Sequence, residues 1–353
     1  MVLSDYGMLL WGNSNTNFNQ ATMGYPTDWN FQYGISKNRG WNNTHLVTYM
    51  ESHDEERLMY KNTAFGNSNG SYSTRDLITG LKRNEMATAF WAMIPGPKLL
   101  WQFGELGYDQ SINRCENGTL DANNCRSSPK PIKWDYANDV NRNSLYKVYA
   151  QLIKLKLTTN YFTTFTTANV TYDFSSAIKW IKLDTDSLKV MVIGNFDVLG
   201  STASISFPSS GTWYSYLTGT TRNATGLTEI ISLQAGEYYV YTNKNVGGSV
   251  ITAVESFIPN NTGNNILSVS PNPISKEAVV TYQIKATGNI SLDVWSLEGK
   301  RLKVLVNGFR TKGNYRLTIT KQELSANNLP VGMYLLRLTE NGNQQTKSFL
   351  ITE

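Results

Sequence analysis

The residues best suited to chemistry lie in one short stretch, from His45 to Leu58. A run of apolar and β-branched residues, Leu46 to Met50, predicts a buried strand, and polar or charged residues fill positions 51–57 directly after it. Proteins with α/β barrels keep their reactive groups in such segments at the carboxyl ends of strands. The sequence has two histidines, and His53, which stands beside Asp54, is the better candidate for imidazole chemistry.

A strand should precede this stretch and a helix should follow it. Gly7–Trp11 is a short apolar run that predicts the strand. Ser73 and Asp76 have the spacing of a capping box, and apolar residues recur at helical intervals from Leu77 to Ile94. The helix must stop at the proline that follows, because proline lacks an amide hydrogen and clashes with the preceding turn.

A second buried strand is expected at Lys98–Phe103, and Glu105 follows it. Strand, helix and strand then form a βαβ unit, in which the two strands run parallel and end at the same edge of the sheet. We therefore expect Glu105 and Asp54 at neighbouring strand ends.

The rest of the chain divides into one helix and two regions rich in strands. From Asn141, apolar residues at helical spacing predict an amphipathic helix. After about residue 160, alternating Thr-rich segments separated by Gly, Asp or Asn turns predict an antiparallel sheet domain. The Gly- and Asn-rich segment 244–265 predicts a linker, and residues 266–353 repeat the strand pattern.

Composition and charge favour an exported protein that handles uncharged ligands. Only 17 % of the 353 residues are charged, and 20 Tyr, 13 Phe and 9 Trp supply aromatic faces that stack on sugar rings. The net charge of +5 is scattered without a basic block, so no nucleic-acid partner is expected. No apolar run is long enough to predict a transmembrane segment, and the first residues lack the pattern of a signal peptide.

The two cysteines, Cys115 and Cys125, lie in a loop rich in Gly, Asn and Asp. No further thiol or histidine lies nearby to complete a metal site, so a disulfide formed in an oxidising compartment is the leading interpretation. Two free surface thiols are the alternative.

Several segments resemble conserved regions of one enzyme family. Met50-Glu-Ser-His-Asp54 resembles the fourth conserved region of the alpha-amylase family, glycoside hydrolase family thirteen, which closes the seventh strand of a (β/α)8 TIM barrel. Ile94–Gly107 is similar to the eighth strand and its exit, and residues 160–243 are similar to the family's C-terminal β domain. The resemblance implies a partial barrel, its last strands and helices, over residues 1–158 and an antiparallel β-sandwich over residues 159–243.

The resemblance also implies roles for single residues in a retaining hydrolase of α-1,4-glucans such as starch, glycogen and maltodextrins. Asp54 would stabilise the oxocarbenium-like transition state, and His53 would bond to the same sugar ring, since hydroxyl contacts that tighten as the ring flattens lower the barrier. Glu51, Arg57 and Glu105 would contribute to substrate binding. Arg57 would either orient the Asp54 carboxylate by a bidentate bond or lie on a solvated face.

Ordinary structural roles are the alternatives to these assignments. Asp54 could be an N-cap near the start of a helix, with His53 satisfied beside it. Trp11, Trp91 and Trp101 could stack on glucose units, although buried core positions are the leading expectation for aromatic residues in strands and helices.

The nucleophile and the general acid of such an enzyme are missing from the sequence. No Gly-x-Arg-x-Asp pattern occurs, and positions 1–50 hold no glutamate and only Asp5 and Asp28 as aspartates. We therefore expect the chain to begin near the sixth barrel strand and to be inactive alone. Asp54 and Glu105 could still act as a catalytic pair, since glycosidases need two carboxyl groups about 5 Å or about 6.5–9.5 Å apart. The alternative class is a non-enzymatic, surface-displayed glycan-binding or adhesive protein.

The chemistry implied by the resemblance requires no cofactor. A structural Ca²⁺ is common in the family and prefers carboxylate oxygens. Asp109, Asp121 and Asp135 follow the second expected strand, but the sequence assigns none of them to a metal.

The last 88 residues, 266–353, resemble a different family. Leu267–Pro273, Ile290–Lys300, Leu329–Leu338 and Thr346–Ile351 are similar in order and spacing to the C-terminal sorting domain of type IX secretion. The resemblance implies an Ig-like β-sandwich, the secretion machinery of a Bacteroidetes-type bacterium as partner, and a secreted or cell-surface protein. An Ig-like spacer or glycan-binding module is the alternative.

Overall fold

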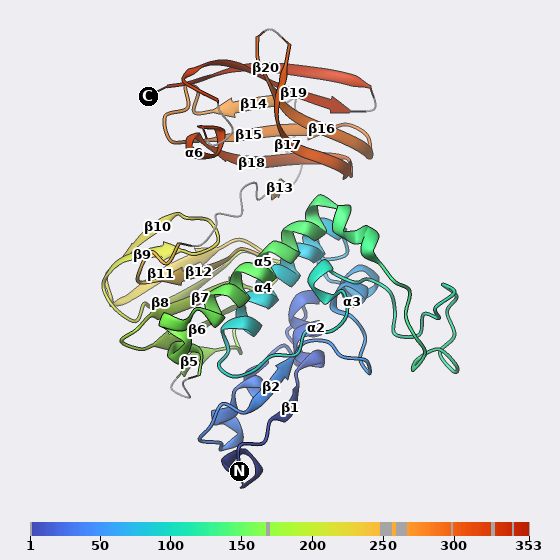
Figure 1. Cartoon of the computed structure of the whole chain (residues 1–353), viewed down its shortest axis with the longest axis vertical. Helices are drawn as coiled ribbons and strands as arrows, with labels where there is room; N and C mark the ends of the chain where they lie inside the picture. The colour runs from blue at the N-terminus through green and yellow to red at the C-terminus, as the bar shows by residue number, and fades with distance from the viewer. Residues whose placement is uncertain are drawn as a thin grey trace. The chain divides into compact units, whose positions relative to one another are not determined.

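The computed structural model describes residues 2–166, 170–247, 256–258, 267–297, 299–325, 329–340 and 342–352. The chain divides into two compact units, Met1–Val250 and Ile251–Glu353 (Figure 1). The boundary falls inside the predicted linker 244–265, of which residues 248–255 and 259–265 lie outside the described residues. In the described part no helix has the length and apolar character needed to cross a membrane.

The first unit opens with a small parallel sheet. Strands β1 (Leu10–Asn13) and β2 (Leu46–Tyr49) pair in parallel, with Leu10 opposite Leu46. On the other side of β2, Lys98 forms a parallel bridge to Thr48. The predicted strand Lys98–Phe103 is therefore wrong beyond its first residue. Within the described residues no strand pairs with the side of Lys98–Phe103 that faces away from β2. The chain turns away at Phe103, whose φ is +59°.

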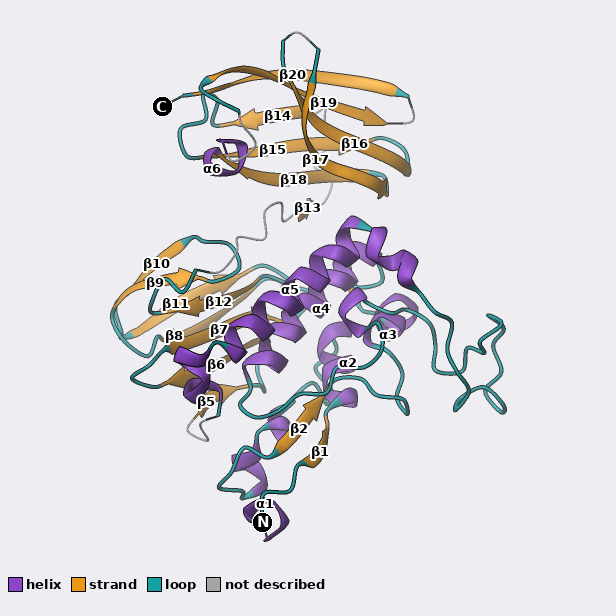
Figure 2. Ribbon diagram, viewed as in Figure 1, coloured by secondary structure: helices purple, strands orange, loops and turns teal. Residues whose placement is uncertain are grey.

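The helices that follow in the chain pack mainly on one another (Figure 2). The longest, α4 (Leu77–Met93), is buried along most of its length and ends just before Pro95, as predicted. The predicted capping box does not form, because Ser73 belongs to the short strand β4 (Tyr72–Ser73) and the Asp76 side chain makes no capping hydrogen bond. The remaining elements are α1 (Val2–Asp5), α2 (Asn15–Met23), α3 (Leu58–Phe65), β3 (Ser68–Asn69) and α5 (Val140–Leu157), with five short 3-10 helices.

An antiparallel sheet domain forms the second half of this unit. Six strands lie in the order β10, β9, β12, β7, β6, β5, and a ribbon of β8 and β11 packs on one face around the buried Trp213. The bounds are β5 (Val170–Asp173), β6 (Ile178–Asp184), β7 (Lys189–Asn195), β8 (Ser201–Ser206), β9 (Gly211–Ser215), β10 (Thr221–Ala224), β11 (Thr228–Leu233) and β12 (Tyr238–Thr242). Strands β5 and β10 were not predicted, because four residues each give too little alternation.

In its described residues the second unit has two four-stranded antiparallel sheets and one short helix. Their orders are β13, β18, β15, β14 and β17, β16, β19, β20. Along β15 the buried side chains alternate regularly, as expected for a strand with one face on the core. The bounds are β13 (Ser256–Ile258), β14 (Leu267–Ser270), β15 (Glu277–Ile284), β16 (Gly288–Trp295), β17 (Arg301–Arg310), β18 (Gly313–Thr320), α6 (Lys321–Ser325), β19 (Gly332–Glu340) and β20 (Asn343–Ile351).

Strand β13 lies inside the segment predicted as a linker. It pairs antiparallel with β18, so residues 256–258 belong to a sheet. Three residues between Gly- and Asn-rich flanks are too short a pattern to be recognised in the sequence.

Buried polar contacts join the helices of the first unit to its sheet domain. Arg83 on α4 is fully buried and donates hydrogen bonds to the carbonyls of Ala21 (2.7 Å), Thr22 and Phe196. Helix α2 thus has two of its C-terminal carbonyls satisfied by α4, and α4 is tied to the end of β7. Because Gly194 on β7 has no side chain, the strand can approach Met86 of α4 closely.

Replacing Arg83 with methionine should lower the free energy of unfolding by roughly 3 kcal/mol, since each buried carbonyl that loses its donor costs about 1–3 kcal/mol. Urea denaturation followed by tryptophan fluorescence measures the change. Lys147→Met, an exposed position on α5, is the matched control and should unfold at the wild-type midpoint. Equal midpoints for both variants would mean that Arg83 does not hold these elements together.

Candidate functional site

The polar loop after β2 is closed at its base by one buried amide. Asn15, at the start of α2, donates from Nδ2 to the carbonyls of Met50 (2.7 Å) and Glu56 (2.9 Å). Asn19, one turn later on α2, donates to the Oδ1 atom of Asn15 at 2.8 Å and so fixes the orientation of that amide. The two ends of the loop 50–56 are therefore held together by α2. Neither asparagine was predicted as part of the site, because an amide that bonds to backbone carbonyls leaves no pattern in the sequence.

His53 and Asp54 stand at the tip of this loop and face solvent. The Nε2 atom of His53 lies 3.3 Å from an Asp54 carboxylate oxygen, and the two side chains are 70 % and 69 % exposed. The imidazole also lies beside the ring of Trp101, with 5.8 Å between ring centroids. These three side chains thus offer an acceptor, an imidazole and an aromatic ring on one accessible surface, the groups that a sugar ring with its hydroxyls can use.

Glu51 and Arg57, at the two ends of the same segment, are buried. Arg57 Nη1 lies 3.3 Å from Glu51 Oε2, and the other carboxylate oxygen accepts the backbone N–H of Leu58 at 2.7 Å. The Arg57 guanidinium also lies over the ring of Tyr108, 4.9 Å from its centroid. Arg57 neither orients the Asp54 carboxylate nor lies on a solvated face, so both expectations were wrong. A buried guanidinium needs a close counterion, and Glu51 supplies it.

Glu105 interacts with the buried pair of Glu51 and Arg57 and, within the described residues, not with Asp54. Burial raises the pKa of Glu105, and the Arg57 guanidinium partly opposes that rise. The preceding Gly104 packs against Glu51, so closely that a Cβ atom there would lie 2.8 Å from Glu51 Oε2. No described contact joins Glu105 to Asp54, and the expected proximity of these two carboxylates has no direct interaction to support it.

The long loop of residues 107–133 also contacts the polar loop 50–56. Glu56 accepts hydrogen bonds from Ser111 Oγ (2.7 Å) and from the backbone N–H of Ile112 (2.8 Å). Arg126 donates to the backbone carbonyl of Asp54. Neither Glu56 nor Arg126 was predicted as a site residue, because neither their type nor their spacing indicates a contact between two loops.

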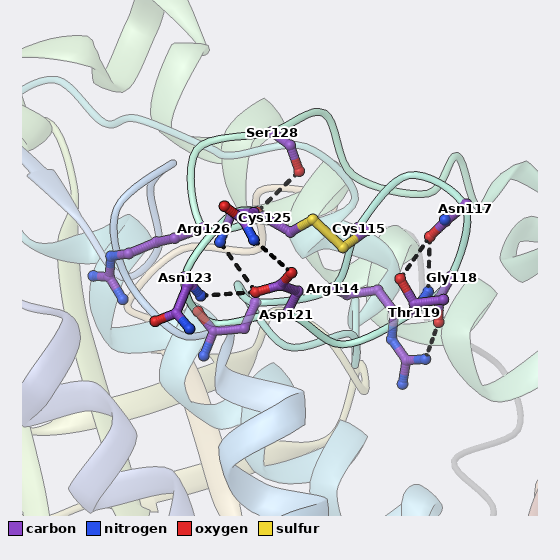
Figure 3. The surroundings of a disulfide bond; sticks show 12 residues. Arg114, Cys115, Asn117, Gly118, Thr119, Asp121, Asn123, Cys125, Arg126 and Ser128 are labelled. Carbon is purple, nitrogen blue, oxygen red and sulfur yellow. Dashed lines mark hydrogen bonds between the residues drawn. A yellow bond between two sulfur atoms is a disulfide. The ribbon is translucent and has the colours of Figure 1, made fainter.

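Cys115 and Cys125 form a disulfide within this long loop (Figure 3). Asp121 lies between them and accepts the backbone N–H groups of Asn123 (2.9 Å) and Asn124 (3.1 Å). The covalent bond and this turn shorten the segment that precedes Arg126, and so limit its freedom at Asp54.

The aspartates considered for a metal have other partners. Asp109 forms an ion pair with Arg142 at 2.7 Å, and Asp135 lies 3.6 Å from Lys133. Asp121 caps its own turn. Within the described ranges no group of three or more His, Cys, Asp or Glu side chains is arranged to hold a metal ion, so we assign no calcium ligands.

The three tryptophans singled out in the sequence have different surroundings. Trp91 is buried in the core and donates its indole N–H to the Thr48 carbonyl at 2.9 Å, so its role is structural. Trp11 is 64 % exposed and lies edge-on to Tyr49. Trp101 is the one of the three that touches His53.

Comparison with known families identifies the end of the chain. Residues 268–352 match the secretion system C-terminal sorting domain. This part of the chain is the signal for type IX secretion, and it directs export to the cell surface or the medium. No curated protein matches the sequence.

Several solved structures are similar to parts of the chain. They include AmyP in complex with maltose (14 % identity, TM-score 0.48, 65 % of this chain and 48 % of that one) and the gamma-CGTase of alkalophilic Bacillus clarkii (13 %, 0.44, 95 % and 44 %). A third is the pullulanase of Anoxybacillus sp. LM18-11 complexed with maltotetraose (14 %, 0.46, 65 % and 34 %). This chain spans less than half the length of each. At these TM-scores we infer no activity from the similarity.

The buried carboxyl of Glu51 should make stability depend on pH. Burial raises the pKa of Glu51 above its ordinary value of 4.5, and the Arg57 guanidinium and the Leu58 amide offset this only in part. The folded state therefore binds this proton more tightly than the unfolded state, so the free energy of unfolding falls as the pH rises from about 4.5 through the folded pKa. Glu51→Gln does not titrate and so removes that pH-dependent contribution, and its stability relative to wild type should therefore rise as the pH rises across this window.

Urea denaturation at a series of pH values from 4 to 7, compared between wild type and variant, measures the effect. Glu116→Gln, which removes the same charge from an exposed loop, controls for net charge. A constant difference in stability between Glu51→Gln and wild type across the series would contradict the assignment.

Proposed function

We propose that this chain is the C-terminal portion of a secreted, retaining hydrolase of α-1,4-glucans of the alpha-amylase type. Asp54 stabilises the oxocarbenium-like transition state and His53 binds the same sugar ring. The observation that carries the proposal is the exposed His53–Asp54 pair on a braced loop after a parallel strand, with the Trp101 ring beside it. Carboxylate and imidazole groups held in one geometry can tighten on sugar hydroxyls as the ring flattens.

The remaining residues of the predicted site support this pair without facing the sugar directly. Glu51 and Arg57 fix the start of α3 and the end of the loop from inside. Glu105 lies at the exit of the segment that follows Lys98, where a half-buried carboxyl can close one end of a substrate site. We assign Glu51, Arg57 and Glu105 to the binding region as positioning residues.

We further propose that β1, β2 and the segment at Lys98 are the last strands of a (β/α)8 barrel, within a domain spanning 1–158. Support comes from their parallel pairing and from the polar loop at the carboxyl end of β2, the edge at which barrel enzymes carry their active sites. Residues 159–243 would be the enzyme's C-terminal β-sandwich, and residues 266–353 an Ig-like β-sandwich that carries the sorting signal.

Catalysis in this scheme needs a nucleophile and a general acid that this chain does not supply. Retaining glycosidases place those two carboxyl groups about 5 Å apart. Around Asp54 the described acidic neighbours are committed elsewhere: Glu55 to Ser52 and Asn13, and Glu56 to Ser111 and Ile112. The isolated polypeptide is therefore inactive.

Purified residues 1–353 should release no reducing ends from soluble starch above the background rate, because one carboxylate cannot perform a double displacement. A reducing-end assay at high protein concentration tests this, with Asp54→Asn as the matched variant. Release that disappears in Asp54→Asn and in Glu105→Gln would show instead that the chain is an intact enzyme using these two carboxylates.

The competing function is a surface-displayed glycan-binding or adhesive protein, favoured by the high exposure of His53 and Asp54. The coding DNA upstream of Met1 separates the two. An in-frame Gly-x-Arg-x-Asp followed by a strand-end glutamate supports the enzyme, whereas a nearby stop codon supports the binding protein.

Deleting residues 268–352 should retain the protein inside the cell, because these residues match the sorting domain. Immunoblots of cell, surface and medium fractions from the native host measure the loss. A fluorescent protein fused to residues 266–353 and carrying an export leader is the converse control and should reach the surface. Surface display of the deleted protein would contradict the assignment of the signal to this domain.

A further inference from the structure

The sheet domain of the first unit contains an open groove of about 720 Å³. It runs between β8 and the hairpin formed by β5 and β6, and the end of β11 closes one side. Strand β8 pairs with β11 on one side, and no described strand pairs with its other edge. The groove has the volume of an ordinary small-ligand site, and none of its lining residues belongs to the loop of His53 and Asp54.

The lining is rich in uncharged polar groups. Asp173 is its one charged residue, and no lysine, arginine or histidine lines it. Residues with hydroxyl or amide side chains border the groove along β8 and the end of β11, and within the described residues these side chains hydrogen-bond to no other protein group: Ser201, Thr202, Ser204, Ser232 and Gln234. Without cations the groove does not suit phosphate, nucleic acid or another anion. With so many hydroxyls it does not suit a lipid.

Trp180 gives the groove an aromatic wall. Its ring is partly buried and packs against the core of the sheet domain. The Lys182 ammonium group lies 4.3 Å from the ring centroid and donates to Ser206 Oγ at 3.2 Å, which holds the indole from one side. In the described part of the chain the indole N–H makes no hydrogen bond to protein, so it is available to a ligand that brings its own acceptor.

Asp173 is prepared as a hydrogen-bond acceptor. Its Oδ1 atom accepts from the backbone N–H (2.7 Å) and hydroxyl (2.6 Å) of Ser175, and its Oδ2 atom accepts from Ser176 Oγ at 2.7 Å. Burial opposes ionisation, but these hydrogen bonds outweigh it and lower the pKa of Asp173. Oδ2 retains capacity for a further donor, such as a sugar hydroxyl.

We propose that this groove binds a neutral oligosaccharide, at a site separate from the loop of His53 and Asp54. An aromatic wall, unspent hydroxyl and amide groups and one oriented carboxylate match a pyranose, which has apolar faces and a rim of hydroxyls. An extended peptide added to the free edge of β8 is the competing occupant. The groove favours the sugar because its walls are hydroxyl-rich and offer no deep apolar pockets for alternate side chains. The inference goes beyond the glucan hydrolase, since it requires no catalysis.

Calorimetric titration of the full chain with maltoheptaose, and separately with cellohexaose, tests the proposal. Thr202→Arg places a long charged side chain at the rim of the groove, from an exposed position on β8. Thr228→Arg, an exposed threonine on the neighbouring strand β11 and outside the groove, is the matched control. Trp180→Ala removes the aromatic wall, and Trp180→Phe keeps the packing and part of the stacking surface. Each titration is repeated in the Asp54→Asn background.

We expect at least one sugar to bind, with an affinity that falls tenfold or more in Thr202→Arg and Trp180→Ala. Thr228→Arg should leave it unchanged, and the losses in Thr202→Arg and Trp180→Ala should persist in the Asp54→Asn background. Sugar binding that is lost in Asp54→Asn and kept in Thr202→Arg would overturn the groove site while supporting the proposed function. Absence of binding to either sugar at millimolar concentration would overturn it too, as would Thr202→Arg-sensitive binding of an unfolded casein peptide in place of sugar.

Discussion

The geometry of the polar loop depends on one buried amide, that of Asn15. The loop carries several charged side chains, which repel one another. The Asn15 side chain bonds to the carbonyls of both Met50 and Glu56 and so keeps the two ends of the loop together. Asn15 can do this only while α2 stays in place. Arg83 satisfies the carbonyls at the far end of α2 and belongs to α4, the most buried helix. The position of His53 and Asp54 is therefore set by a series of polar contacts that begins in the core.

The same loop separates buried charge from exposed charge over a few residues. Glu51 and Arg57 are removed from water and compensate each other, whereas His53 and Asp54 remain in water. Desolvating a carboxylate costs several kcal/mol unless it is paired and hydrogen-bonded, and Arg57 and the Leu58 amide offset that cost for Glu51 only in part. Asp54 faces solvent with the exposed His53 imidazole beside it, so the loop presents one carboxylate to a ligand and buries the other.

Local patterns in the sequence were sufficient for the long elements and insufficient for the contacts between them. The stripe at 77–93 and the helix after Asp139 were recognisable because the helix period repeats over many residues. The run at 46–49 was recognisable because it is apolar or β-branched and a dense polar segment follows it. The strand predicted at Lys98–Phe103 was wrong past Lys98, because a strand needs a partner and the sequence cannot show whether one is present. Asn15 and Arg83 were missed for a related reason: each bonds to backbone carbonyls, which every residue has, so no pairing of residue types marks the contact.

The sheet domain and the helices form one unit through contacts that leave little freedom between them. Glu85 on α4 accepts from Ser144 on α5 and from Tyr238 on β12, both at 3.2 Å. Lys179 on β6 is fully buried, with its ammonium group 4.0 Å from the ring centroid of Trp29 and hydrogen-bonded to the Phe174 carbonyl at 2.6 Å. If the loop of His53 and Asp54 and the groove beside Trp180 both bind sugar, as proposed, these contacts would fix the distance between the two sites. Once one site held a polymer, the other would meet the same chain at an effective concentration set by that distance. Long glucans would then bind more tightly than short ones, even where each site alone binds its sugar weakly.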